Sequence, residues 1–159
     1  MRGVIDETTI NRMQDLVDQH PEVTTLVMEE VPGSNSARST FSAARIARLH
    51  GLKTHIPPGG VVASGGTDFF IAGLTRTIGV GGKVGVHSWE TKDNAGNPII
   101  GASLPRTHGL HRNFISYYID MGIPEDFYWF SIAAAPPDGV HWMTEEELER
   151  YGLLRDAAP

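Results

Sequence analysis

The segment Val61-Val62-Ala63-Ser64-Gly65-Gly66-Thr67-Asp68-Phe69-Phe70-Ile71-Ala72-Gly73 changes character at its fourth residue. Its first three residues are typical of a short buried strand, and an apolar helical pattern follows the serine. Ser64 therefore stands at a predicted corner between a strand and a helix. The first N–H groups of a helix lack partners within the helix and can hold an oxyanion. The glycines after Ser64 let a substrate approach the backbone closely.

Two interpretations of Ser64 follow from this position. Serine at the start of a helix most often caps it, by accepting a hydrogen bond from a backbone N–H group. Alternatively, Ser64 is a nucleophile whose attack is stabilised by the free helix donors. The second interpretation requires a base, because a serine hydroxyl reacts slowly until a neighbouring group removes its proton.

The bulk composition indicates one soluble globular domain. The chain has 159 residues, of which 40% are hydrophobic and 20% charged, which suits a single core. The net charge of −6 and the lack of a long basic run argue against a nucleic-acid partner. The sequence contains no cysteine, which excludes disulfides and thiolate chemistry. We expect one domain over residues 1–155 and a short tail over residues 156–159.

Strand and helix patterns alternate along the chain, which predicts an α/β domain with a largely parallel sheet. The pattern predicts strands over 24–31, 53–57, 61–63, 76–78 and 83–89, and helices that end near residues 20, 50, 72, 121, 135 and 151. The helix that ends near 121 is expected to begin at about Leu104, and Thr144 with Glu147 predicts a capping box for the last helix.

The predicted sheet brings two turns together. The turn Pro32-Gly33-Ser34 follows one strand, and the Ser64 corner follows another. Ligands of open α/β sheets bind outside the carboxyl ends of the strands. We therefore expect the two turns to lie side by side at one site.

His87 is the best candidate for the base. It ends the apolar run Lys83-Val84-Gly85-Val86-His87, which follows the Ser64 helix and can return to the serine corner. Asp138, in a Pro-Pro-Asp-Gly turn, is our candidate for the acceptor that orients the imidazole. The alternatives are a histidine with a purely structural role and an aspartate that bonds its own turn.

Taken together, these motifs resemble the Clp protease proteolytic subunit and the wider Clp/crotonase superfamily. Val31-Pro32-Gly33-Ser34 stands where the family has a Ser-Pro-Gly-Gly turn, and Ala63-Ser64-Gly65-Gly66 resembles its nucleophile element. Gly85-Val86-His87 resembles the strand that carries the base. The segment from Met143 to Leu153 resembles the helix that follows the third member of the triad.

The resemblance implies a Clp/crotonase-like fold of repeated ββα units with a helical carboxyl-terminal region. It also implies a serine peptidase in which Ser64 attacks, His87 acts as base and Asp138 orients it. The backbone N–H groups of Gly33 and Gly65 would form the oxyanion hole. These turns would hold the substrate through Ser34 and Gly66.

The sequence departs from the family pattern in three places. Ser34 replaces the second glycine of the oxyanion turn. An ungapped match of the last helix puts Val140 at the acid position, so Asp138 requires a shift of two residues. The segment that these peptidases use to dock an unfoldase is missing, so we expect no ATPase partner.

Two other functions remain open at this point. One is a crotonase-like enzyme that binds an acyl thioester, and the other is an inactive binding or assembly module of the same fold. His108 and His111 could bind a metal, but no carboxylate lies beside them at a suitable spacing. We therefore predict neither a metal nor a cofactor.

The resemblance also indicates the partners of the chain. It implies a peptide or protein substrate and a homo-oligomer, in which the helices of residues 104–130 contact a neighbour. The chain as it stands has no leader signal, which suits the cytoplasm. A removed leader would instead place it in the periplasm.

Overall fold

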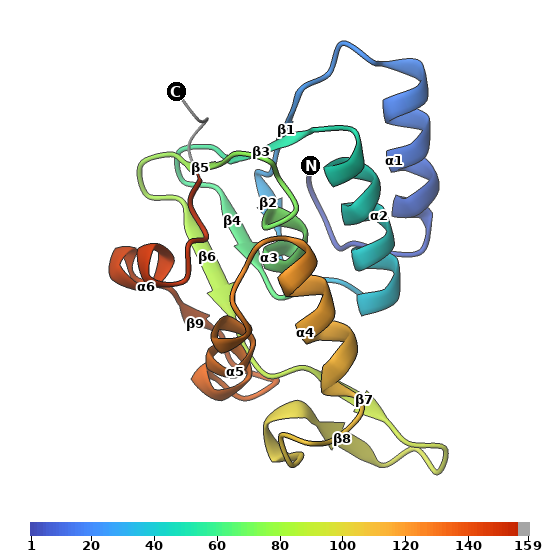
Figure 1. The fold of residues 1–159 in the computed structure, drawn as a ribbon, viewed down its shortest axis with the longest axis vertical. Helices are drawn as coiled ribbons and strands as arrows, with labels where there is room; N and C mark the ends of the chain where they lie inside the picture. Colours follow the sequence, from blue (N-terminus) through green and yellow to red (C-terminus); the bar gives the residue numbers. More distant parts are fainter. Residues whose placement is uncertain (156–159) are drawn as a thin grey trace.

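The computed structural model describes residues 1–155 and has the α/β composition expected from the sequence (Figure 1). The tail predicted over residues 156–159 lies outside the described residues. The strands are β1 (Thr25–Val27), β2 (Glu30–Val31), β3 (Lys53–Ile56), β4 (Val61–Ala63), β5 (Arg76–Ile78), β6 (Lys83–Val86), β7 (Glu90–Lys92), β8 (Pro98–Ile100) and β9 (His141–Trp142). The helices are α1 (Thr8–Gln19), α2 (Ala37–Leu49), α3 (Gly65–Phe70), α4 (His111–Asp120), α5 (Glu125–Ala134) and α6 (Glu145–Arg150), with a 3-10 turn at Gly101–Ser103.

The strands form two parallel arrays where the sequence predicts one. Strands β1, β3 and β5 make one sheet, and β2, β4 and β6 make a second sheet, which β9 extends in the antiparallel direction. Strands β7 and β8 form a separate antiparallel hairpin. Two parallel strands that pair run in the same direction, so the chain must cross over between them through a helix or a loop.

The segment of residues 24–31, predicted as one strand, is divided between the two sheets. β1 pairs with β3, whereas β2 pairs with β4. Met28 lies between them, fully buried, and its N–H still donates to the carbonyl oxygen of His55 at 2.8 Å. An apolar run indicates that a strand is buried on both faces, but it does not indicate which strand lies beside it. The sequence therefore could not show that residues 24–31 change their pairing from β3 to β4.

The helices cover the sheets on two sides. Helices α1 and α2 pack against each other on one side, and α3 lies between the β2–β4–β6 sheet and α4 (Figure 1). Helices α5 and α6 and strand β9 lie beyond β6. No helix within residues 1–155 is long and apolar enough to cross a membrane.

Helix α4 begins later than its pattern predicts. The segment from Leu104 forms turns, and the helix begins only at His111. Pro105 and Gly109 lie in the segment that the helix excludes. Both residue types disfavour a helix interior, and here their effect outweighs the apolar periodicity.

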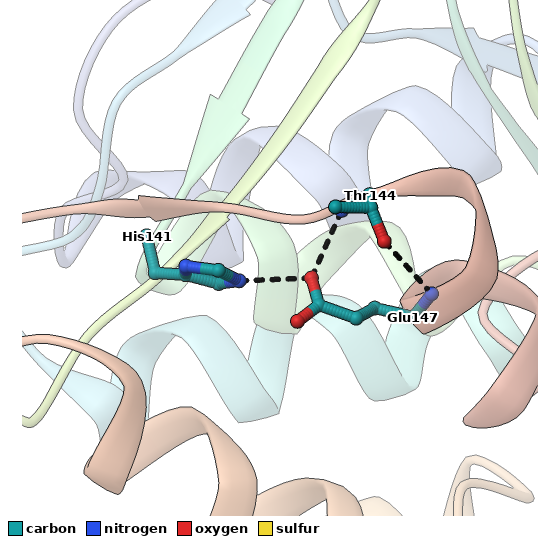
Figure 2. A network of polar contacts seen from close by, with 3 residues as sticks. All are labelled: His141, Thr144 and Glu147. Carbon is teal, nitrogen blue, oxygen red and sulfur yellow. Dashed lines mark hydrogen bonds and ion pairs between the residues drawn. The ribbon is translucent and has the colours of Figure 1, made fainter.

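The capping box of α6 is confirmed. The Thr144 hydroxyl accepts a hydrogen bond from the Glu147 N–H at 3.3 Å, and the Glu147 carboxylate accepts one from the Thr144 N–H at 2.9 Å. The same carboxylate lies 2.8 Å from His141 Nε2 on β9 (Figure 2). The cap therefore also ties the last helix to the edge of the second sheet.

A buried guanidinium fastens the carboxyl-terminal segment to α3. Arg76 is 2% exposed, and it donates to the carbonyl oxygens of Leu153 at 2.7 Å and Gly152 at 2.9 Å. It also donates to the carbonyls of Ile71 and Gly73, which follow α3. Burial lowers the pKa of Arg76 to about 10, so the charge persists and its donors are satisfied by backbone acceptors.

The packing of α3 on β2 depends on a glycine. A Cβ atom at Gly66 would overlap the carbonyl oxygen of Val31, which is backbone and part of a sheet. A side chain at this position would push the helix away from the strand, which is an overpacked arrangement.

We predict that Gly66→Ala lowers the free energy of unfolding by about 2 kcal/mol or more, because the sheet cannot shift without losing its own packing. Denaturant unfolding measures the change. Gly109→Ala is the matched control, since its Cβ would meet only the Arg112 side chain at 3.9 Å. Equal stabilities of the two variants would contradict the close contact.

Candidate active site

Ser64 occupies a strained backbone position at the corner between β4 and α3. Its φ is 54° and its ψ is −124°, and within residues 1–155 it is the only residue other than glycine with a positive φ. Such a conformation costs on the order of 1–3 kcal/mol and persists only where the surroundings impose it. A strained strand-to-helix turn of this kind is also how some hydrolases present a nucleophilic serine.

The Ser64 hydroxyl does not cap the helix. The residue is at the N-cap position of α3, but its side chain makes no capping hydrogen bond. Its N–H continues the sheet ladder by donating to the Gly85 carbonyl oxygen at 3.1 Å. The capping interpretation therefore does not describe this structure, and the hydroxyl is left for another role.

The two turns expected to meet do lie side by side. A Cβ atom at Gly33 would lie 3.6 Å from Ser64 Cβ and 3.9 Å from Ser64 Oγ, and one at Gly65 would overlap the Ser34 side chain. Within residues 1–155, the N–H groups of Gly33, Ser34 and Gly65 donate to no protein acceptor. The corner therefore holds free backbone donors next to the serine.

Of these donors, Ser34 was not among those predicted from the sequence. An ideal Cβ on Gly65 would lie 3.0 Å from the Ser34 nitrogen, which places the Ser34 N–H group beside the corner. Ser34 therefore offers a main-chain donor as well as a hydroxyl.

His87 comes directly after the last residue of β6. Because β6 pairs with β4, the strand brings His87 to the same edge of the sheet as Ser64. Its Nδ1–H donates to the carbonyl oxygen of Ser88 at 2.8 Å. A carbonyl can only accept, so Nδ1 carries the proton and Nε2 is the basic nitrogen of the neutral ring.

A cavity of about 580 Å³ contains both candidate catalytic side chains. Its lining comes from the two turns, the end of β6, the β7 hairpin and the start of α4: Ser34, Asn35, Ser36, Ala37, Ser64, Gly65, Asp68, His87, Trp89, Glu90, Thr91, Leu110, Asn113, Phe114 and Pro137. A smaller cavity of about 40 Å³ shares Ser64, Asp68 and His87 and is lined further by aromatic residues of α4 and α5. The predicted residues Ser34, Ser64, Gly65 and His87 are thus brought together.

Three predicted site residues lie elsewhere or only near the cavity. Gly33 lies against Ser64 but does not itself line the cavity, and Gly66 is buried against β2. Asp138 is exposed, and only its neighbour Pro137 lines the cavity. Within the described residues Asp138 has no hydrogen bond to His87, whose Nδ1–H is taken by Ser88.

Asp68 is a residue of the cavity that the sequence analysis did not single out. It lies one turn after Ser64, and its N–H donates to the Ser64 carbonyl oxygen at 3.0 Å. Tyr118 Oη donates to its carboxylate at 2.6 Å, and Tyr117 Oη donates to its main-chain carbonyl at 2.6 Å. Its only sequence signal is a lone acidic residue within an apolar helix, four positions after the serine.

The two histidines considered as metal ligands, His108 and His111, do not lie on one helix, because α4 begins only at His111. His108 precedes α4, and the ring centroids of His108 and His111 lie 6.4 Å apart at 82°. His111 is buried, with Nδ1 bonded to the Tyr128 hydroxyl. Within residues 1–155 no group of three or more His, Cys, Asp or Glu residues is placed to hold a metal ion.

Comparisons with known proteins find similarity in three dimensions only. No protein-family model matches the sequence, and no curated protein matches it. Among solved structures, this chain is similar to the 1510-N membrane-bound stomatin-specific protease, in the form of a lysine-to-alanine mutant in complex with a substrate peptide. The two chains are 18% identical, the TM-score is 0.65, and the match covers 97% of this chain and 70% of the protease chain. Its serine-to-alanine mutant matches at 18% identity and TM-score 0.66, over 97% and 74% of the two chains.

A third structure, the 1510-N membrane protease specific for a stomatin homolog from Pyrococcus horikoshii, matches at 17% identity and TM-score 0.59, over 98% and 69% of the two chains. At this level of identity the likeness shows the fold. The chain therefore has a protease-like α/β fold, as the motifs around Ser64 and His87 led us to expect.

The ionisation of Asp68 predicts a pH dependence of stability. Burial raises the pKa of Asp68 to about 7, although the Tyr118 hydrogen bond acts in the opposite direction. The same carboxyl ionises near pH 4 in the unfolded chain, so the folded state binds more protons between these values. The free energy of unfolding should therefore fall as the pH rises from about 4 to about 7, and this contribution should level off above.

We expect Asp68→Asn to remove a decrease of about 2–3 kcal/mol between pH 5 and pH 8. Urea unfolding at both pH values measures it. Asp15→Asn, an exposed position on α1, serves as the control and should leave the decrease in place. Identical pH profiles of the wild type and Asp68→Asn would contradict the assignment.

Proposed function

We propose that this protein is a serine hydrolase of the peptidase class, in which Ser64 is the nucleophile and His87 the general base. The single observation that carries the proposal is the strained, uncapped Ser64, which shares a cavity with a histidine whose Nε2 is the basic nitrogen. The protease-like fold supports it, since solved structures of that fold include a protease bound to a substrate peptide.

The proposed reaction is acyl transfer in two steps. Ser64 Oγ attacks the carbonyl carbon of the scissile bond while His87 Nε2 takes the hydroxyl proton. The free N–H groups of Gly65 and of the Gly33–Ser34 turn stabilise the negative charge that develops on the carbonyl oxygen. His87 then gives its proton to the leaving amine, and a water molecule, deprotonated by His87, releases the acyl group from Ser64.

Two groups compete for the role of orienting His87. The Ser88 carbonyl accepts the Nδ1–H bond in this structure, and Asp138 is the candidate that the sequence motif suggests. A carboxylate would stabilise the imidazolium ion more strongly than a neutral carbonyl does. Asp138→Asn separates them, because a loss of activity of several orders of magnitude assigns the role to Asp138 and a small loss assigns it to Ser88.

The crotonase-like enzyme and the inactive module would require other features of the corner at Ser64 than a hydrolase does. Neither needs an uncapped serine beside a histidine, and no observation on the described residues favours them over hydrolysis. Binding of acyl-coenzyme A without covalent labelling of Ser64 would restore the first of these alternatives. We also propose that the chain forms a homo-oligomer, as its resemblance to the Clp/crotonase superfamily implies.

A fluorophosphonate probe tests the nucleophile directly. We expect it to label Ser64, which mass spectrometry of tryptic peptides would locate, and we expect labelling to be lost in Ser64→Ala and to slow at least a hundredfold in His87→Ala. His50→Ala is a matched control, because His50 also bonds a backbone carbonyl through Nδ1, at 3.0 Å, but lies outside the cavity. Unchanged labelling in His87→Ala would refute the base.

A pair of substitutions at one position tests the oxyanion hole. Gly33→Pro removes the backbone donor and should slow labelling by about a hundredfold or more, the usual effect of losing one such donor. Gly33→Ala keeps the N–H, and its Cβ meets Ser64 only at ordinary contact distance, so it should label at a rate near that of the wild type. Full labelling of a folded Gly33→Pro variant would assign the role to Ser34 instead.

A further inference from the structure

Asp68 is a carboxylate that the proposed reaction does not use, although it lines both cavities at the candidate active site. Oδ1 accepts the hydrogen bond from Tyr118 at 2.6 Å. Oδ2 has no partner within residues 1–155, and it is not among the polar atoms that are sealed off from solvent. One oxygen is therefore held by the protein, while the other remains available to a ligand in the cavity.

The position of Asp68 relies on two helices. It lies on the first turn of α3, four residues after Ser64, and the side chains of both residues line the same two cavities. Tyr117 and Tyr118 of α4 bond its carbonyl and its carboxylate. A substrate whose carbonyl Ser64 attacks would thus occupy the same cavity as a group that binds Oδ2.

The charged side chains that line the cavity favour a cationic ligand. Apart from His87, its ionisable lining residues are Asp68 and Glu90, and neither cavity is lined by a lysine or an arginine. Two aromatic residues, Trp89 and Phe114, line both cavities, and aromatic rings attract cations. Within residues 1–155 no cationic side chain forms an ion pair with Asp68, so a cation from the substrate is the missing partner.

We infer that Asp68 determines specificity, and that it binds an ammonium or guanidinium group on the substrate residue whose carbonyl Ser64 attacks. The inference rests on the proposed function, because it names the substrate class of the same site. The cation can be the side chain of a lysine or arginine, or the free α-amino group of the first residue of a peptide. The two sources share the same contact with Oδ2.

The energetic case follows from what burial does to this carboxyl. Burial raises its pKa to about 7, which means that its ionised form is poorly solvated in the free protein. A bound cation supplies the interaction that water no longer provides, and a neutral substrate leaves the charge unpaired. Sites that leave a buried polar group unpaired discriminate strongly against the wrong substrate.

Covalent probes with matched side chains test the inference. Acetylated peptidyl diphenyl phosphonates with lysine or norleucine at the reacting residue differ by the ammonium group alone. In each, Ser64 Oγ bonds to phosphorus and a phenol leaves. We expect the lysine probe to label Ser64 at least tenfold faster than the norleucine probe, and we expect Asp68→Asn to bring this ratio close to one. Asp15→Asn should keep the ratio.

A second pair of probes separates the two sources of the cation. A one-residue alanine phosphonate with a free amino group is compared with its acetylated form. A preference of tenfold or more in either pair, lost in Asp68→Asn, supports the inference. Ratios of one in both pairs, or preferences that survive in Asp68→Asn, overturn it.

The pH dependence of the ratio gives a measurement that needs no variant. The ratio should rise between pH 5.5 and pH 8 as Asp68 ionises, while the effect of His87 on the nucleophile cancels between the two probes. The ionisable groups around Asp68 come from β6, β7, α4 and α5, and they are His87, Glu90, Tyr117, Tyr118 and Tyr128. Burial raises the pKa of each of these tyrosines, so they stay neutral throughout this range.

The neutral fluorophosphonate probe keeps the two proposals apart. If it fails to label wild-type Ser64, the hydrolase proposal fails, and the inference fails with it. If it labels Ser64 but neither pair of phosphonate probes shows a preference for the cation, only the inference is wrong. Loss of fluorophosphonate labelling in an Asp68→Asn variant that circular dichroism shows to be folded would mean that the carboxylate serves the nucleophile, which also overturns it.

Discussion

The contact between Gly66 and the Val31 carbonyl is the constraint on which the site depends. It lets α3 lie directly on the β2–β4–β6 sheet, so that the chain must turn sharply between β4 and the helix. Ser64 takes up this turn with a φ of 54°. The same closeness brings the Gly33–Ser34 turn against the serine and leaves its N–H groups free. A strained serine and a set of unpaired donors thus have one physical origin.

The second constraint is electrostatic. The cavity places Asp68 where water cannot solvate its charge well, which opposes folding when the carboxyl is ionised. Such groups persist at functional sites because the unfavourable charge becomes favourable when the proper ligand binds. The tyrosines of α4 hold the carboxyl in place through Tyr118 and the helix backbone through Tyr117. Stability and recognition therefore act in opposite directions on the same residue.

Most of the candidate site could be predicted from the sequence because it depends on local patterns. A strand, a serine and two glycines specify the Ser64 corner, and the apolar run that ends at His87 predicts a strand in the same parallel array, which the structure pairs with β4. That pairing alone brings His87 into the cavity. Asp68 escaped notice because its role depends on what surrounds it. A single carboxylate in an apolar helix does not reveal whether the partner is a tyrosine, a base or solvent.

By itself, the sequence determined the α/β class, the corner at Ser64, the turn at Gly33 and the capping box of Thr144 and Glu147, since each depends on residues close together in the chain. Only the tertiary structure decided that residues 24–31 divide between two sheets, that Tyr118 holds the Asp68 carboxylate, and that the guanidinium of Arg76 ties Leu153 to the end of α3. These features join segments far apart in sequence. Their free energy comes from burial and from partners that no local pattern specifies.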